Sequence, residues 1–319
     1  MRRIRTYHEV ADMGGEDVIA QVEAQAQRLA DRLAEVGRVV AIASGKGGVG
    51  KSAVAANVAA ALAAEGRRVG AADADLNGPT LARMLGAVRR PLSVSAEGVE
   101  PARGAAGVKV MSMALLLDAD DAPVRWREPP IGGFIWQSTL ETGALREFLA
   151  DVAWGPLDVL VVDLPPGTDK LARLLSLLPR LDALALVTTP SEAARYVVAK
   201  SARAAREAGV ANVGLVANMT AYLCPACGAE EALWKADGAR ALAEAAELPV
   251  WAEVPFDPAL AAATDAGRPI VLDRIDSPAA QALRALATRL AGDSLADDRP
   301  AGDPLAGAPH GGDPGIANR

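Results

Sequence analysis

"VVAIASGKGGVGKS", residues 39–52, joins an apolar run to a glycine-rich loop and to the first residues of a helical pattern. The loop, residues 45–52, satisfies GxxxxGK[ST] and lies directly after a predicted strand and before a predicted helix, as that pattern requires. Glycines let successive backbone N–H groups turn toward phosphate oxygens, and the helix N-terminus adds the positive end of its dipole. The stretch therefore predicts a nucleotide site, and its context disfavours the alternative of a glycine-rich turn with a chance lysine.

The loop residues are expected to bind nucleotide together, and they are Gly45, Lys46, Gly47, Gly48, Val49, Gly50, Lys51 and Ser52. Lys51 is expected to reach the β- and γ-phosphates as a catalytic residue, and the Ser52 hydroxyl is expected to bind Mg²⁺.

From residue 39 onward, short apolar runs alternate with helical patterns, which predicts an α/β fold with a doubly wound, mostly parallel sheet. The predicted strands are residues 39–44, 67–73, 108–113, 157–163, 183–189, 212–218 and 249–255. Helical patterns with suitable end signals cover residues 51–66 and 191–209. We expect three parts: an N-terminal amphipathic helix over residues 1–37, with its apolar face in residues 17–37, a P-loop ATPase domain over residues 38–292, and a disordered tail over residues 293–319.

Composition narrows the class of protein. The chain has 319 residues, of which 51% are hydrophobic, and a net charge of -7, which is typical of a soluble globular protein. Nucleic-acid binding is disfavoured because no basic surface for phosphates stands out. The N-terminal "MRRIRTYHEV" lacks the apolar core of a signal peptide, and no stretch approaches about 20 consecutive apolar residues, so we expect a cytoplasmic protein without a membrane partner.

Acidic residues at strand ends fit the same nucleotide site. Asp73 and Asp75 follow the second predicted strand, at the edge where ligands bind in open α/β sheets. Asp163 ends another apolar run and is expected to hold Mg²⁺ through its water shell, while Asp75 positions the attacking water. Gly167 is expected to let the following loop move with the γ-phosphate. Without the phosphate loop, each acid would equally suit a strand end or a helix cap.

"LCPACG", residues 223–228, contains both cysteines of the chain, Cys224 and Cys227. Its proline and glycine favour a tight knuckle that aims both sulfurs at one point. A closed zinc or iron–sulfur site needs about four ligands, and the two histidines, His8 and His310, lie near opposite ends of the sequence. Small buried side chains, a transient disulfide and half of a metal site all remain open, as does the choice between zinc and a cluster.

Lys46 gives the loop a second lysine, and the resulting KGGVGK[ST] pattern resembles the deviant Walker A group, which includes MinD, ParA and the nitrogenase iron protein. In that group the early lysine crosses a dimer interface to the nucleotide of the other subunit. The resemblance implies that Lys46 is catalytic in an ATP-dependent homodimer. The alternative is an exposed loop lysine without such a role.

A series of segments resembles the Mrp family, also called ApbC or Nbp-type ATP-binding iron–sulfur carriers, over roughly residues 38–290. The segments are "DADLNGPT", "WREPPIGGFIWQSTLETGALREFL", "WGPLDVLVVDLPPGT", "ANMTAYLCPACG" and "VPFDPALAAATDAGRPIV". The resemblance implies that Cys224 and Cys227 of two subunits hold a bridging 4Fe-4S cluster, received from cluster-assembly proteins and passed to apo iron–sulfur recipient proteins under the control of ATP. It also implies that Asn218, Pro255 and Asp257 border the adenine base.

Two segments depart from the family pattern. "DLPPGTDK" stands where DLPPGTGD is common, so Asp169 is shifted and Lys170 is unusual, and "LWKADG" stands in place of FGxGG. Two alternatives remain at this point. One is a MinD/ParA-like switch with structural zinc at the cysteines, and the other is an ATP-dependent enzyme of the dethiobiotin synthetase kind, which gives the cysteines no role.

Overall fold

The computed structural model describes residues 15–76, 78–87, 93–116, 145–146, 148–234 and 237–292, with only the backbone given for residues 15–22 and 170. The expectations for His8, His310, the tail over residues 293–319, residues 117–144 and the Lys170 side chain lie outside this described part.

The helices are α2 (Gly15–Ala34), α3 (Lys51–Ala64), α4 (Leu81–Met84), α6 (Thr168–Leu175), α7 (Ala194–Glu207), α8 (Gly238–Ala246), α9 (Pro258–Asp265), α10 (Ile270–Asp273) and α11 (Pro278–Leu290), with 3₁₀ turns η1 (Ala105–Gly107) and η2 (Met113–Leu115). The strands are β1 (Val36–Ala43), β2 (Val69–Asp73), β3 (Ala102–Arg103), β4 (Lys109–Met111), β5 (Leu157–Asp163), β6 (Ala183–Thr188), β7 (Val213–Leu223), β8 (Glu230–Ala232) and β9 (Val250–Phe256).

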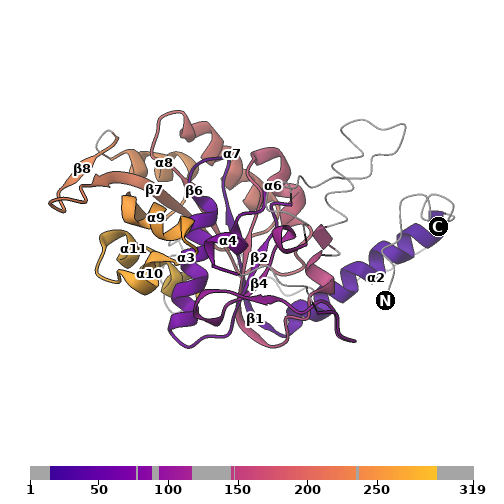
Figure 1. The fold of residues 1–319 in the computed structure, drawn as a ribbon. Coiled ribbons are helices and arrows are strands. Elements are labelled where there is room, and N and C mark those ends of the chain that lie inside the picture. Colours follow the sequence, from indigo (N-terminus) through magenta and orange to yellow (C-terminus); the bar gives the residue numbers. More distant parts are fainter. Residues whose placement is uncertain are drawn as a thin grey trace, which may run out of the picture.

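The strands form one nine-stranded sheet in the order β3-β4-β2-β5-β1-β6-β7-β8, with β9 also paired to β7 (Figure 1). All pairs are parallel except β3 with β4 and β8 with β7. The continuous apolar runs of the sequence become strands that are buried on both faces, as parallel sheets require. The predicted doubly wound, mostly parallel α/β sheet is therefore confirmed.

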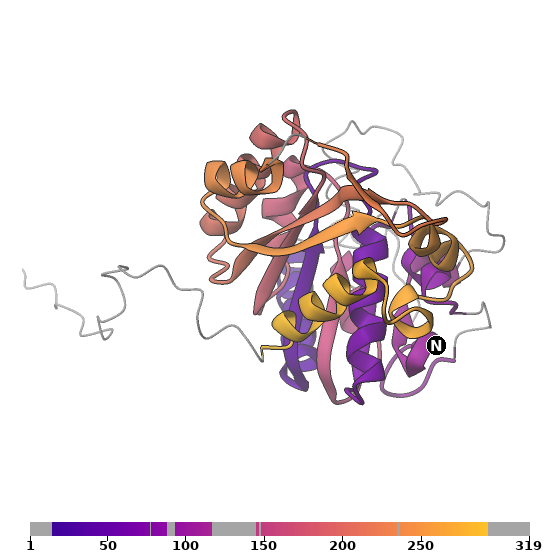
Figure 2. The same cartoon turned by 90° about the vertical axis from the view of Figure 1, so that its left-hand side faces the viewer.

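Helices cover both faces of the sheet. Alternate residues of β1 divide between two cores: Val40 and Ile42 pack with α3, α4, α10 and α11, whereas Val39 and Ala41 pack with α2, α6, α7 and α8. Figure 2 looks onto the first of these layers, where α10 and α11 lie over α3. β1 lies inside the sheet between β5 and β6, and the loop that follows it lies at the carboxyl edge of these parallel strands.

The N-terminal helix ends earlier than the pattern over residues 17–37 predicts. Leu29 and Leu33 pack into the core, but α2 stops at Ala34, and Val36 already pairs with Leu157 as the first residue of β1. The apolar spacing misplaced this boundary because a buried strand residue and a buried helix residue have the same chemistry.

Strand β7 is longer than predicted and extends beyond its pairing with β6. It pairs with β6 only through Ala217, and its last residues, Ala221–Leu223, pair with the antiparallel strand β8. β7 and β8 thus form a hairpin, which extends outward at the β8 label in Figure 1. The cysteines lie in the turn of this hairpin. The sequence pattern did not predict β8, whose residues are all exposed and lack the apolar alternation of a buried strand.

Candidate functional site

The predicted phosphate loop joins β1 to α3. Gly48 and Gly50 have φ values of 77° and 82°, in the left-handed region that favours glycine. A Cβ on Gly47 or Gly48 would meet no atom within 4 Å, so the space around these residues is open. A Cβ on Gly45 would lie 2.1 Å from a methyl carbon of Val197, so the start of the loop packs directly against α7. The loop thus has both the open space and the helix N-terminus that bind phosphate.

Lys51 forms a buried ion pair with Asp163. The lysine is 6% exposed and the aspartate is fully buried. The Lys51 ammonium also donates to the Ser52 hydroxyl at 3.2 Å. The second carboxylate oxygen of Asp163, Oδ2, is buried without a hydrogen-bond partner among the described residues. Burial raises the pKa of Asp163, and Lys51 opposes this shift. An unpaired buried carboxylate oxygen beside a serine hydroxyl fits a hydrated Mg²⁺ ion.

Asp73 lies beside Asp163 on the neighbouring strand β2 and is fully buried. It accepts hydrogen bonds from the Leu81 N–H at 3.0 Å and the Ser112 hydroxyl at 2.9 Å. Burial, followed by the charge of Asp163, raises the pKa of Asp73 to about 7. The sequence pattern placed Asp73 at the site without a separate role. In the structure, Asp73 fixes the loop after β2 by accepting from the Leu81 N–H. The sequence signal for this role was the spacing of Asp73 and Asp75, with one residue between them.

Asp75 follows β2 and is half-buried, and its carboxylate accepts from the Gly78 N–H at 3.2 Å. Its charge raises the pKa of Asp163, although less than burial does. Lys51 thus contacts both Ser52 and Asp163, and Asp75 follows β2, the strand beside the one that ends in Asp163. The catalytic and Mg²⁺-binding roles of these residues stay predictions.

Lys46 and Gly167 lie at the open side of the loop. Lys46 is half-buried, and its ammonium has no ion-pair or hydrogen-bond partner in the described part of the chain. The Gly167 N–H donates to the Ser44 carbonyl at 3.0 Å, and Gly167 has a φ of 117°. The turn before α6 is therefore tied to the end of β1, where a change in the loop would reach it.

The three predicted adenine residues lie on or directly after the neighbouring strands β7 and β9. Asn218 pairs in register with Val254, next to Pro255 in β9, and Asp257 follows that strand. The Asn218 amide donates to the Val49 carbonyl at 2.8 Å, so its side chain is directed onto the phosphate loop. Asp257 accepts from the Ala259 N–H at 2.8 Å and caps α9. The grip of Asn218 on the loop was not predicted, because it joins residues 169 positions apart.

The cysteines form the tight knuckle that the proline and glycine predict. The Cys224 N–H donates to the Ala229 carbonyl at 2.9 Å, the Gly228 N–H donates to the Cys224 carbonyl at 2.8 Å, and Gly228 has a φ of 74°. The backbone N–H groups of Cys227 and Ala226 and the Cys227 thiol point at the Cys224 sulfur and lower the pKa of Cys224. Cys227 is exposed and Cys224 is half-buried. No group of three or more His, Cys, Asp or Glu residues with metal-ligand geometry occurs in the described ranges.

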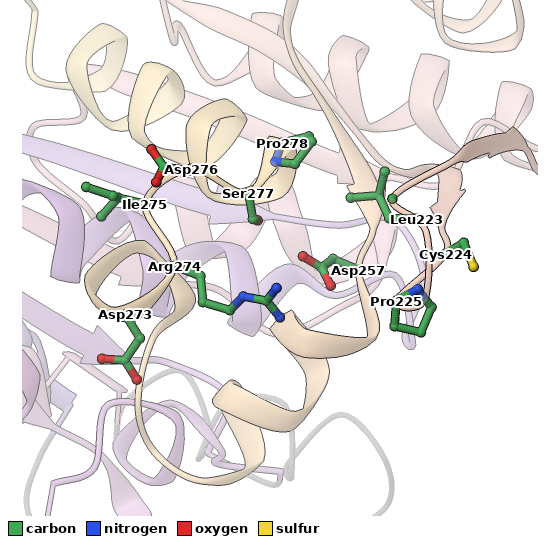
Figure 3. Close-up of a pocket in the computed structure, with 11 residues that line it drawn as sticks. Leu223, Cys224, Pro225, Asp257, Asp273, Arg274, Ile275, Asp276, Ser277 and Pro278 are labelled. Carbon is green, nitrogen blue, oxygen red and sulfur yellow. The ribbon is translucent and has the colours of Figure 1, made fainter.

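A pocket of about 620 Å³ lies between this knuckle and the turn from α10 to α11. Leu223, Pro225, Asp257 and Arg274 are among the residues that line it. Figure 3 shows Arg274 reaching across the pocket toward Asp257, whereas the Cys224 sulfur points away from it. The knuckle is thus accessible from outside the pocket, which suits a metal held at the protein surface.

The fold and the loop define a P-loop NTPase of the MinD/ParA type. The cell division ATPase MinD of Pyrococcus furiosus is similar in structure, with a TM-score of 0.56 and 25% identity over 81% of this chain and 100% of that one. A nucleotide-binding protein from Archaeoglobus fulgidus, in complex with ADP and with cobalt found by PIXE, matches with a TM-score of 0.64 and 35% identity over 76% of this chain and 91% of that one.

The family described as "ParA: NUBPL iron-transfer P-loop NTPase" matches residues 35–291. An iron–sulfur cluster carrier protein from Saccharolobus solfataricus is 35% identical over 271 residues, which cover 85% of this chain and 88% of that protein. This chain therefore belongs to the family of iron-transfer P-loop NTPases, and the predicted resemblance to iron–sulfur carriers is confirmed. No helix in the described ranges is long and apolar enough to cross a membrane.

Proposed function

We propose that this protein is an ATP-dependent iron–sulfur cluster carrier that acts as a homodimer. Two copies hold one 4Fe-4S cluster between them on Cys224 and Cys227 of each chain, and pass it to apoproteins. The observation that carries this proposal is the knuckle, in which two neighbouring thiols lie in the hairpin turn directly after β7, the strand that contacts the phosphate loop through Asn218.

The knuckle suits a cargo that must be both bound and released. Iron is held by thiolates, and a lowered pKa of Cys224 increases the thiolate fraction near neutral pH. The exposure of Cys227 leaves the cluster within reach of an incoming apoprotein. Each chain contributes two ligands, and a two-fold axis between copies supplies the other two.

ATP binding and hydrolysis control the carrier in this proposal. When nucleotide binds, the Lys51 ammonium leaves its ion pair with Asp163 and pairs with the β- and γ-phosphates, because a phosphate is its stronger partner in this loop. Ser52 and Asp163 hold Mg²⁺, which supplies charge compensation for the phosphates. Asp75 positions the attacking water, and the unpaired Lys46 reaches the nucleotide of the second copy.

The remaining assignments follow from the same function. The backbone of residues 45–52 binds the phosphates, and Asn218, Pro255 and Asp257 border the adenine. The ATPase domain begins with β1 at Val36 and runs to residue 292, and α2 (Gly15–Ala34) precedes it and packs on its core through Leu29 and Leu33. The partners are cluster-assembly proteins and apo iron–sulfur recipients in the cytoplasm, without nucleic acid or membrane.

Anaerobic reconstitution tests the carrier assignment. Protein supplied with iron and sulfide should assemble about one 4Fe-4S cluster per dimer, measured by iron and sulfide analysis and by absorption spectra. Cys224→Ala and Cys227→Ala should lose the cluster, because each removes two of the four ligands in the dimer. Ala226→Ser changes one of the two residues between the cysteines and should keep the cluster. Full assembly by Cys224→Ala would contradict the proposal, and zinc without sulfide in all preparations would favour a MinD/ParA-like switch with a structural metal.

A further inference from the structure

We propose that Trp234 is a positioning residue that links the phosphate loop to the cysteine knuckle through Met219 and Asn218. The inference rests on the proposed control of the cluster site by ATP, and it assigns that control to specific contacts. Among the described residues, Trp234 makes no hydrogen bond to the phosphate loop or to the cysteines. Its indole N–H donates to the Met219 carbonyl, so it acts on both sites through Met219.

The first contact joins β7 to the loop. The buried Asn218 side chain donates to the Val49 carbonyl at 2.8 Å. The fit is tight, because a Cβ on Gly50 would lie 2.3 Å from the Asn218 amide nitrogen and 3.6 Å from the terminal methyl of Met219. Any rearrangement of residues 49 and 50 around a phosphate therefore displaces Asn218 or Met219.

Met219 interrupts the regular backbone of β7. It has a φ of 59°, although methionine lacks the local hydrogen bonding that lets asparagine or aspartate adopt this region. The other described non-glycine residues with positive φ lie in a 3₁₀ turn or at the caps of α8, whereas Met219 lies inside a strand. The pairing of β7 with β9 also shifts register between Asn218 and Tyr222. A methionine in this region is strained, so a change to extended backbone angles would lower its conformational energy. The same change would reorient the hairpin that follows it.

The second contact holds the returning leg of the hairpin. The Trp234 indole N–H donates to the Met219 carbonyl at 2.6 Å, two residues after the end of β8. β8 pairs with Ala221–Leu223, and the Leu233 N–H donates to the Thr220 carbonyl at 3.4 Å, so the returning leg is held to β7 directly after Met219. Tyr222 also pairs with Phe256 of β9. The knuckle at residues 224–228 is therefore expected to move with the Met219 peptide. Trp234 couples Met219 to the returning leg, so both legs of the hairpin move together.

Cysteine alkylation in cluster-free protein tests this link. We expect a saturating non-hydrolysable ATP analogue to change the rate of reaction of Cys224 and Cys227 with iodoacetamide by at least about fivefold, the lower end of ordinary coupling between two sites. Trp234→Phe keeps an aromatic ring but removes the donor, so it should reduce the change to less than about twofold while nucleotide still binds. Sedimentation in the same samples reports whether two copies associate.

Trp251→Phe is the matched control. The Trp251 indole nitrogen is buried without a hydrogen-bond partner among the described residues, so this substitution removes a tryptophan without removing such a bond. It should keep the wild-type response. If Trp234→Phe does not fold, Met219→Gly provides the test, because glycine relaxes the left-handed position and should also weaken the response.

A wild-type protein that binds nucleotide without any change in alkylation would overturn the inference. A full response in Trp234→Phe, or a response lost only because two copies no longer associate, would also overturn it. Because no cluster is present in this assay, failure to assemble one with the alkylation response intact would count against the carrier function alone. Normal cluster assembly without the response would count against the link alone.

Discussion

Asp73 is the residue whose environment departs most from its ordinary chemistry. It is fully buried, lies next to a second buried aspartate and has a pKa raised to about 7. Its hydrogen bonds to the Leu81 N–H and the Ser112 hydroxyl hold the backbone from which Asp75 projects. The carboxyl is thus a structural support for a catalytic neighbour, maintained at a cost in desolvation.

That raised pKa predicts a dependence of stability on pH. The native state binds the Asp73 proton more tightly than the unfolded chain, whose aspartate pKa is about 3.9. The stabilisation is therefore complete below about pH 4 and is lost as the pH rises through about 7. Asp73→Asn should flatten this part of the profile in urea unfolding without Mg²⁺ at pH 5 and pH 8. Identical slopes for wild type and variant would contradict the prediction, and Asp158, whose pKa is lowered to about 2, remains in both proteins as a common background.

At the scale of elements, the carboxyl ends of the parallel strands bring the site together. β1 supplies the phosphate loop, β2 and β5 supply the acids, and β7 and β9 supply the residues expected at the adenine. Two helices on this side begin with the same kind of cap. Asp257 caps α9 by accepting from the Ala259 N–H, and Ser277 caps α11 by accepting from the Ala280 N–H, each with a proline at the next position.

These two caps separate stability from nucleotide binding. Asp257→Ala and Ser277→Ala should each lower the free energy of unfolding by about 1 kcal/mol, since each leaves a helix N–H without its acceptor. Only Asp257→Ala should also weaken nucleotide binding, because only Asp257 is proposed to border the adenine. Urea unfolding and calorimetric titration with ADP measure the two effects. Equal nucleotide affinity in both variants would remove Asp257 from the proposed site.

At the scale of the whole molecule, the features left incomplete in one chain lie on the loop and the hairpin. Lys46 has no partner for its ammonium within the described part of the chain, and the knuckle offers two thiols. Both are completed by one two-fold axis in the proposed homodimer. A nucleotide that joins the two loops would then also bring the two knuckles together.

Mixing two inactive variants tests whether Lys46 acts across that axis. Lys46→Ala and Asp75→Ala should each reduce ATP hydrolysis by about a hundredfold or more, because each removes charge or positioning at the γ-phosphate. In a mixed dimer, the site built on the Lys46→Ala chain receives an intact lysine from the other chain and keeps its own Asp75. An equal mixture should therefore recover about a quarter of the wild-type rate, since half of the dimers are mixed and half of their sites are complete. No recovery in dimers shown to exchange chains would place Lys46 in its own site.

Much of the fold and of the nucleotide site was predictable because their signals are local. Alternating apolar runs and helical patterns specify a parallel sheet, and a glycine-rich loop between a strand and a helix specifies a phosphate site. The tight turn at Cys224 and Cys227 is also local, since Pro225 and Gly228 lie within it. The exposed strand β8 was missed because it has no burial pattern to read.

The sequence by itself determined the class of fold, the phosphate loop and the knuckle, because each depends on residues close together in the chain. Only the tertiary structure decided that Lys51 rests on Asp163, that Asn218 grips Val49, and that Trp234 holds Met219. The Lys51–Asp163 and Asn218–Val49 contacts join residues 112 and 169 positions apart. Such pairs form where strand order, register and burial bring separate segments together, and no local spacing encodes them.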